Sequence, residues 1–192
     1  EPGTNPGFLY QQSTMRDAIV AALTLNIFNK HADKIIMANI AQTVNVLQSV
    51  ILTDGEKMVK TPTYYVFKMY KEHQNNTLLG SYITSENIES KNDRNKQFPQ
   101  LIESASTDEN GTIYSTITNT SSSKSAKIKC QIADTKVDSI YPEIIGGECH
   151  DKNDFENQDK VKTVKFTDYK KLKDGFTAVI PACSVVKFVI NK

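Results

Sequence analysis

The stretch AKIKCQI, residues 126–132, alternates apolar and polar side chains without interruption. Its apolar members are Ala126, Ile128, Cys130 and Ile132, and its polar members are Lys127, Lys129 and Gln131. Successive side chains of an extended chain point to opposite faces, so this period of two predicts a β-strand with one buried and one solvated face. Such strands are typical of antiparallel sheets. We therefore predict an antiparallel β-sandwich around this stretch.

Turn signals on both sides support the sandwich. Asn110-Gly111 and Asp174-Gly175 are dipeptides that favour tight β-hairpins. The segment SVVKFVI, residues 184–190, follows the second of them, and we expect its inward side chains to be Val186, Phe188 and Ile190. The polar stretches 86–97 and 149–160 are predicted to be long loops at the ends of the sandwich. The sandwich is expected to occupy residues 78–192.

Composition divides the chain near Leu78. All four methionines precede this point, and all three cysteines follow it. We therefore predict two units, residues 1–77 and 78–192. The first unit should open with a loop, EPGTNPGFLYQQ (1–12), because its Pro-Gly turns oppose regular structure.

A helix is predicted from Thr14 to about Lys30. Thr14 and Asp17 have the spacing of a capping box, in which each side chain covers a free N–H group of the other residue. Apolar residues are spread too widely over 15–28 for a surface helix, which predicts a largely buried one. Lys30 and His31 place positive charge at its C-terminal end.

Two further elements are predicted in the first unit. DKIIMAN, residues 33–39, is nearly all apolar and is expected to form a short strand buried on both faces. Thr61 and Pro62 mark the start of a second helix, with one face formed by Val66, Met69, Tyr70 and His73. His31 and His73 fall at helix ends, where a capping role is the expected one.

Four amides recur at intervals of three in MANIAQTVNVLQS, residues 37–49. They are Asn39, Gln42, Asn45 and Gln48, set in an otherwise apolar run. Asn39 and Asn45 are expected to satisfy backbone groups at a turn, and Gln48 to lie on a solvated face. The residues alone give Gln42 no special role.

The segments MRDAIVAALTLNIFNKHADKIIMANIAQTVNVLQSVILT (15–53) and TPTYYVFKMYKEHQ (61–74) resemble the C-terminal part of family fifty-one α-L-arabinofuranosidases. The closing FTAVIPACSVVKFVI (176–190) is also similar to that family. Its members are retaining glycosidases with a (β/α)8 barrel followed by a C-terminal β-sandwich. The resemblance implies an α+β chain: a jelly-roll-like antiparallel sandwich preceded by barrel helix 7, strand 8 and helix 8.

The same resemblance assigns a role to Gln42. In the family, the glutamine of this Ala-Gln pair follows the eighth strand and hydrogen-bonds the arabinofuranosyl unit. A neutral amide can donate to and accept from sugar hydroxyls without adding charge beside catalytic carboxylates. Gln42 is therefore the one substrate-binding residue that we carry over from the family.

The family's catalytic residues have no counterpart in the sequence. Retaining glycosidases use two carboxyl groups roughly 5 Å apart, one as nucleophile and one as acid/base. In this family the nucleophile lies in an Asp-Glu-Trp motif, and this chain contains no tryptophan. We expect a fragment that begins after the nucleophile strand, contains neither catalytic glutamate and is inactive alone.

Other functions receive less support. The net charge of +1 gives no general attraction to nucleic acid or anionic membranes, and no apolar run approaches the roughly 20 residues of a membrane span. Cys130, Cys149 and Cys183 lack metal-pair spacing, and the sequence around Cys149-His150-Asp151 is expected to be a solvated loop. No metal or cofactor is implied.

The partners implied by the resemblance are an arabinose-containing polysaccharide or oligosaccharide and further copies of the chain. The opening sequence does not have the features of a signal peptide, so the compartment stays open: cytoplasm, or periplasm or exterior of a bacterium. Two alternatives remain, a non-catalytic carbohydrate-binding sandwich and an oligomerisation module. The first of these should carry an exposed aromatic platform on one face.

Overall fold

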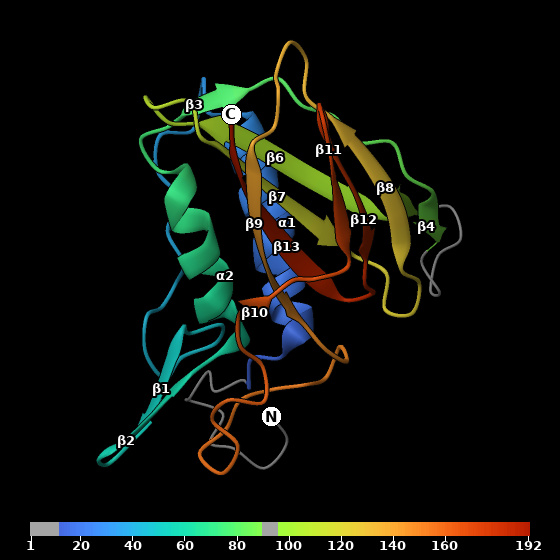
Figure 1. The fold of residues 1–192 in the computed structure, drawn as a ribbon. Helices are drawn as coiled ribbons and strands as arrows, with labels where there is room; N and C mark the ends of the chain where they lie inside the picture. The colour runs from blue at the N-terminus through green and yellow to red at the C-terminus, as the bar shows by residue number, and fades with distance from the viewer. Residues whose placement is uncertain (1–11, 90–95) are drawn as a thin grey trace.

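The computed structural model describes residues 12–89 and 96–192, so the loop predicted at 1–12 lies almost wholly outside the described residues. Most of its described strands form two packed sheets, with helices on the outer face of the larger one (Figure 1). The larger sheet has the strand order β10 (Val164–Lys165), β9 (Ser139–Gly146), β13 (Ser184–Asn191), β7 (Ile113–Asn119), β6 (Leu101–Thr107) and β3 (Thr77–Leu79). The smaller sheet is β11 (Tyr169–Leu172), β12 (Gly175–Ile180) and β8 (Ala126–Gln131). All their pairings are antiparallel, which confirms the predicted sandwich.

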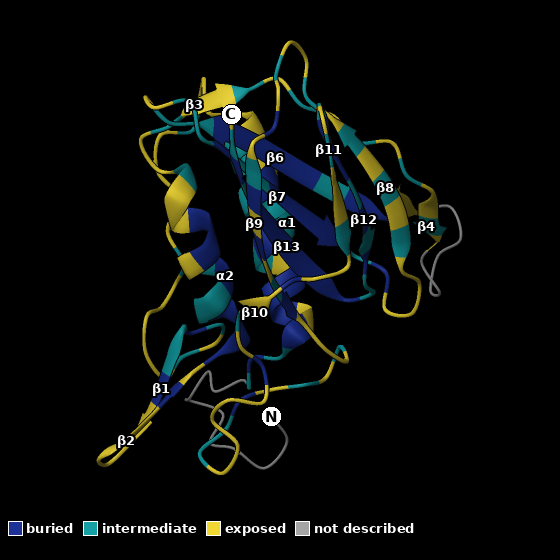
Figure 2. Ribbon diagram, viewed as in Figure 1, coloured by how far each residue is buried: buried dark blue, intermediate teal, exposed yellow. Residues whose placement is uncertain are grey.

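The core of the sandwich lies between the two sheets. Phe188 of β13 and Phe176 of β12 are fully buried, and their rings stack with centroids 4.2 Å apart. Val186 and Ile190 are buried on the same face, as the alternation predicted. Figure 2 shows β8 alternating between exposed and half-buried residues, in keeping with one wet face.

Both predicted hairpin turns are present. In the β6–β7 turn the N–H of Gly111 donates to the carbonyl of Asp108, whose carboxylate accepts the N–H groups of Asn110 and Thr112. The β11–β12 turn ends at Gly175, where a Cβ atom would collide with the carbonyl oxygen of Cys130. The second turn therefore requires glycine because two strands approach closely there.

Helices α1 (Met15–Lys30) and α2 (Pro62–Tyr70), the latter extended by a short 3₁₀ turn η1 (Lys71–His73), cover the other face of the larger sheet. The capping box predicted for α1 is formed, and within it the N–H of Thr14 donates to Asp17 Oδ2 at 2.8 Å. The hydroxyl of Thr14 also donates to Asp17 Oδ2, at 2.9 Å. Buried apolar residues of α1, α2 and β13 form one cluster that includes Met15, Ala18, Val66, Met69 and Val185. The expectation of a largely buried α1 is correct for one face only, since Val20 and Ile27 are exposed.

The strand predicted at residues 33–39 does not form. This segment has no regular structure, and the side chains of Ile36 and Met37 are 97% and 73% exposed. A strand requires a hydrogen-bonding neighbour, and no other described segment pairs with this one. An apolar run of this kind is therefore left on the surface as irregular chain.

Two smaller hairpins complete the described structure. β1 (Ile51–Asp54) pairs with β2 (Lys57–Lys60) and projects from the lower end of the molecule (Figure 1). β4 (Asn87–Glu89) pairs with β5 (Gln97–Pro99), so the prediction of a plain loop over 86–97 is wrong at both of its ends. Short alternating polar strands of this kind carry too little apolar signal to be recognised in the sequence.

Candidate functional site

Gln42 lies in the segment that connects α1 to the β1–β2 hairpin. The helix end is closed by a turn in which the N–H groups of Lys34 and Ile35 both donate to the carbonyl of His31, at 2.9 Å each. On the other side, the carbonyl of Thr43 accepts the N–H of Ile51 at 3.1 Å. The segment is therefore anchored at both ends, and Gln42 itself is exposed.

The other amides of the repeat have different surroundings. The backbone of Asn45 has a φ of +59°, and its side chain accepts the N–H of Thr53 at 2.7 Å and donates to the Thr53 hydroxyl at 2.9 Å. This confirms that Asn45 satisfies backbone groups. Asn39 is exposed, whereas Gln48 is half-buried rather than solvated. Asn39, Gln42 and Asn45 are all exposed, and Gln42 is the one that immediately precedes Thr43, whose carbonyl accepts the N–H of Ile51.

Exposed apolar side chains are concentrated around Gln42. Ile36, Met37, Val44 and Leu47 all lie in the same segment, and each is at least 38% exposed. Apolar side chains exposed close together in the sequence can mark a place where another surface packs. The segment therefore combines a hydrogen-bonding amide with apolar residues that have no described partner.

The sequence around Cys149-His150-Asp151 forms a loop held by an ion pair. Among the described residues, no three or more His, Cys, Asp or Glu side chains are grouped so that they could hold a metal ion. Hydrogen bonding from Lys160 is the main reason that the pKa of Asp151 is lowered, and their atoms Oδ1 and Nζ are 2.7 Å apart. The loop is also less solvated than predicted, because Asn153 is fully buried and bonds to the backbone of Lys60 and Val161.

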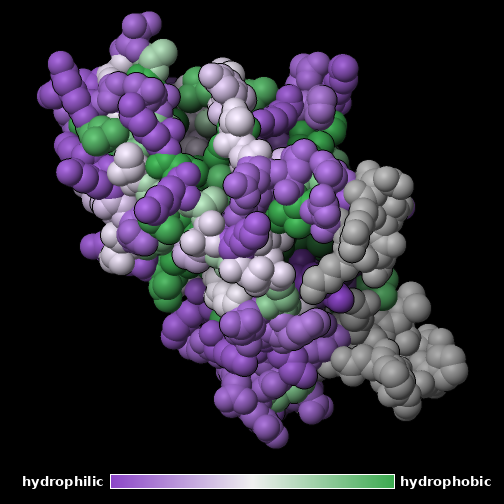
Figure 3. Space-filling model, turned by 90° about the vertical axis from the view of Figure 1, so that its right-hand side faces the viewer, coloured by the Kyte–Doolittle hydropathy of each residue, from purple (hydrophilic) through white to green (hydrophobic). Residues whose placement is uncertain are grey.

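A cavity of about 720 Å³ opens between the two sheets at the free edge of β8. Its walls mix aliphatic residues, such as Ile113, Ile117 and Ile128, with polar ones, and the carboxylate of Glu103 on its wall is bonded to Lys30 and Ser81. Figure 3 shows that the side of the molecule that bears β8 is largely hydrophilic around smaller apolar areas.

The described residues include three exposed aromatic rings, of which Phe98 lies on β5 of the small hairpin and the two most exposed, Tyr82 and Tyr141, lie on different faces. Tyr82 lines the cavity between the sheets. Tyr141 of β9 is paired with Val189 and thus lies on the opposite, helix-covered face of the larger sheet. This pair does not form the platform expected of a stand-alone carbohydrate-binding module.

The profile of the α-L-arabinofuranosidase C-terminal domain matches residues 1–184 of the chain. The chain belongs to this family. An intracellular exo-α-L-arabinofuranosidase from Bacteroides ovatus is 43% identical over 187 residues. That match covers 97% of this chain and 36% of the relative, so this family member spans only about a third of its relative's length.

Solved structures agree on the fold. The GH51 arabinofuranosidase from Xanthomonas axonopodis pv. citri superposes with a TM-score of 0.93 and 37% identity, over 100% of this chain and 38% of that one. The α-L-arabinofuranosidase from Thermotoga maritima, solved as an arabinose complex, superposes with a TM-score of 0.83 over 97% of this chain and 40% of that one. Its identity of 22% supports the fold alone. The arabinofuranosidase C-terminal domain thus accounts for both the sandwich and the helices packed on it.

Two sites of the domain were not recognised from the sequence. One is a buried polar cluster centred on Asn26 of α1, whose amide bonds to Ile102, Ser104, Thr116 and Thr118. The other is the contact of two cysteine thiols, Cys149 and Cys183. Residues of both sites are far apart in sequence, so only the tertiary structure brings them together.

Neither described helix has the length and apolarity that a membrane crossing needs.

His73 lies against the larger sheet and does not cap a helix. Its ring nitrogens are 2.8 Å from the Ser106 hydroxyl and 3.2 Å from the Thr116 hydroxyl. Burial, with a smaller contribution from the positive charge of Lys187, lowers the pKa of His73 to about 4. The capping role predicted for His73 is therefore wrong, because the sheet offers it two hydroxyl partners.

Acid should destabilise the fold through His73. In the unfolded chain this residue binds a proton below about pH 6.5, whereas in the folded chain it stays neutral down to about pH 4. The contribution of neutral His73 to the free energy of unfolding is therefore fully present above pH 6.5. It falls by up to about 3 kcal/mol as the pH drops toward 4. Urea denaturation at several pH values in this window measures the slope. His73→Gln should remove this part of the pH dependence, whereas the control His31→Gln, at an exposed histidine, should keep it. The same slope of unfolding free energy against pH for His73→Gln and the parent would contradict this prediction.

Proposed function

We propose that this chain is the C-terminal part of a longer α-L-arabinofuranosidase, in which residues up to about 77 complete a catalytic (β/α)8 barrel and residues 78–192 form a supporting sandwich. The observation that carries this proposal is the pair of exposed apolar side chains Ile36 and Met37 just before Gln42, in a chain of the arabinofuranosidase C-terminal domain family. Partner strands on both sides would bury Ile36 and Met37 and supply the missing backbone hydrogen bonds.

The reaction of that longer enzyme would be hydrolysis of terminal α-L-arabinofuranosyl residues from arabinan or arabinoxylan with retention of configuration. Both catalytic carboxyl groups would lie outside these 192 residues. Active sites of such barrels lie at the C-terminal ends of the strands. Gln42 follows the segment proposed as the last strand, so its amide would contact a hydroxyl group of the arabinofuranosyl unit.

A chimera tests the role of Gln42. The 192 residues replace the corresponding C-terminal part of the Xanthomonas axonopodis enzyme, and kcat/KM is measured with an aryl α-L-arabinofuranoside. Gln42→Ala should lower kcat/KM by roughly 5- to 150-fold, equivalent to about 1–3 kcal/mol for one hydrogen bond in a closed site. The matched control is Gln48→Ala, an amide of the same segment that should leave kcat/KM unchanged. Equal rates for the chimera and its Gln42→Ala variant would contradict the assignment.

We further propose that the isolated chain self-associates through the same segment. Exposed Ile36 and Met37 offer apolar surface that a second copy can cover. Light scattering should give a mass above the 21.5 kDa of one chain, and Ile36→Lys combined with Met37→Lys should return it to that value. Val164→Lys, a change at an exposed valine on edge strand β10, is the control that should not alter the mass. A parent chain of 21.5 kDa at all concentrations would refute self-association.

A further inference from the structure

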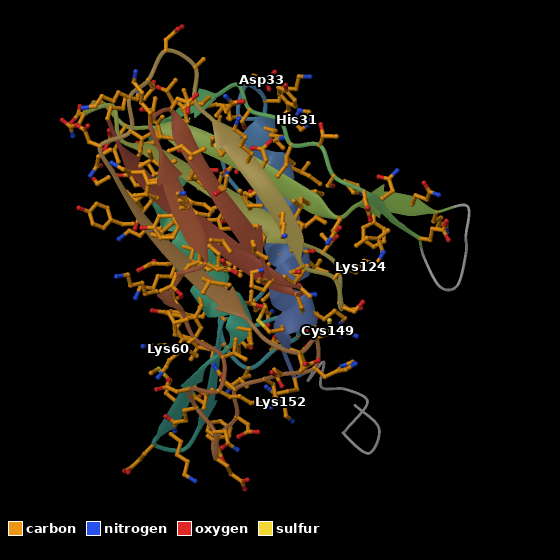
Figure 4. The ribbon with its side chains drawn as sticks, turned by 45° about the vertical axis from the view of Figure 1, so that its right-hand side comes forward. His31, Asp33, Lys60, Lys124, Cys149 and Lys152 are labelled. Atoms are coloured by element: carbon orange, nitrogen blue, oxygen red, sulfur yellow. The ribbon has the colours of Figure 1, made fainter. Side chains whose placement is uncertain are left out.

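Two of the three cysteines meet at one end of the sandwich. The Sγ atoms of Cys149 and Cys183 are 3.2 Å apart, although the residues are 34 positions apart in sequence. Cys183 is 3% exposed, whereas Cys149 is half-buried and is the more exposed of the two. The third cysteine, Cys130, lies on β8 of the other sheet. Figure 4 shows Cys149 beside the N-terminal end of α1, opposite the end that bears His31.

The backbone holds the two thiols in this position. β9 and β13 are paired with Gly146 opposite Ser184, so Cys149 follows one strand and Cys183 precedes the other at the same end of the sheet. Gly146 permits this approach, since a Cβ there would lie 3.0 Å from the Cβ of Ser184. The N–H of Cys183 donates to the carbonyl of Ser121 at 2.7 Å, and the carbonyl of Cys149 accepts the N–H of Arg16 at 2.9 Å.

We propose that Cys149 and Cys183 are a site of oxidative modification and form a reversible disulfide. The bond would join the loop after β9 to the turn before β13. That loop also accepts hydrogen bonds from the first turn of α1, from Met15 to the carbonyl of Asp151 and from Arg16 to that of Cys149. The disulfide therefore fixes the start of α1 to the sandwich. This inference rests on the thiol geometry and is independent of the proposed function.

A small-molecule disulfide such as oxidised glutathione is a sufficient oxidant. The thiolate of the more exposed Cys149 attacks one sulfur of glutathione disulfide, which forms a mixed disulfide and releases one glutathione thiolate. Cys183 then loses its proton, its sulfur attacks Cys149 Sγ, and the second glutathione thiolate leaves. Two protein thiols are oxidised and one glutathione disulfide is reduced to two thiols. Burial, followed by the neighbouring Cys149 thiol, raises the pKa of Cys183 to about 12, which makes Cys183 a poor first nucleophile.

Thiol counting on the whole chain tests the proposal. The protein is equilibrated with graded ratios of reduced to oxidised glutathione, quenched with acid and titrated for free thiols in denaturant. The count should fall from three to one, and peptide mapping should find Cys149 linked to Cys183. Because the bond closes a long loop, the melting temperature of the oxidised chain should rise by roughly 5–10 °C. Reduction should reverse both changes.

Two variants separate this pair from other thiol chemistry. On oxidation by glutathione, the Cys130→Ser variant should lose its two remaining free thiols together. The Cys149→Ser variant should keep both of its free thiols under the same conditions. Circular dichroism verifies that each variant is folded, and Cys149→Ala serves as the substitute if the serine disturbs folding. A count of three in the parent at every glutathione ratio would overturn the proposal. So would a stable glutathione adduct on Cys149 that Cys183 does not displace, or a disulfide that includes Cys130.

Discussion

Purified alone, the 192-residue chain should release no arabinose from an aryl α-L-arabinofuranoside. Double displacement needs a carboxylate nucleophile and a carboxylic acid roughly 5 Å apart across the glycosidic bond. The candidate segment of this chain contributes an amide, and the family's nucleophile motif is not found in the sequence. Enzymatic acceleration of at least about a millionfold depends on such groups, so their loss removes measurable turnover.

The assay for this prediction compares three samples at equal molar concentration: the chain, the heat-treated chain and the intact Xanthomonas axonopodis enzyme. Released aryl alcohol is followed over hours. Only the intact enzyme should exceed the blank. Turnover above the heat-treated control that co-purifies with the chain through successive columns would show that the chain contains a complete catalytic site.

The largest loss of stability is expected for Asn26→Ala. Asn26 is fully buried between α1 and the larger sheet, and its side chain makes four hydrogen bonds. Its Nδ2 donates to the carbonyl of Ile102 and to Thr118, and its Oδ1 accepts from the hydroxyls of Ser104 and Thr116. The alanine variant would leave these partners buried with fewer bonds and open a small void. We expect a cost of about 3–5 kcal/mol.

Asn29 provides the matched control for Asn26. It lies one turn later on the same helix, is half-buried and makes a single side-chain bond, to Ser104 at 3.0 Å. Asn29→Ala should cost about 1 kcal/mol. Thermal unfolding followed by circular dichroism should therefore show a fall of roughly 10 °C or more for Asn26→Ala and a few degrees for Asn29→Ala. Equal shifts for the two variants would contradict the account of the buried cluster.

Local signals in the sequence were sufficient for much of the fold. The alternation in 126–132, the Asn110-Gly111 and Asp174-Gly175 turns and the Thr14 capping box all act over a few residues, and each is present in the structure. An apolar run is different, because its conformation depends on its neighbours. Residues 33–39 have the composition of a buried strand, but no described strand lies beside them, so the predicted strand is absent.

The candidate site depended on distant information even more strongly. Nothing in the spacing of the four amides distinguishes Gln42 from the others, and only the resemblance to the arabinofuranosidases assigned it a role. His73 was misassigned because its partners, Ser106 and Thr116, come from strands more than 30 residues away. The contact of Cys149 with Cys183 likewise follows from the pairing of β9 with β13. A single sequence does not reveal such contacts without the tertiary fold.

The central claim is that residues 34–40 become a paired barrel strand when the rest of the enzyme is present. Amide hydrogen exchange of this segment, measured in the isolated chain and in the chimera with the Xanthomonas axonopodis enzyme, tests it directly. Exchange should be fast in the isolated chain at concentrations low enough for it to be monomeric, and in the chimera it should slow by roughly a hundredfold or more, because strand amides are protected by their hydrogen bonds. Fast exchange of residues 34–40 in an active, folded chimera would contradict the account.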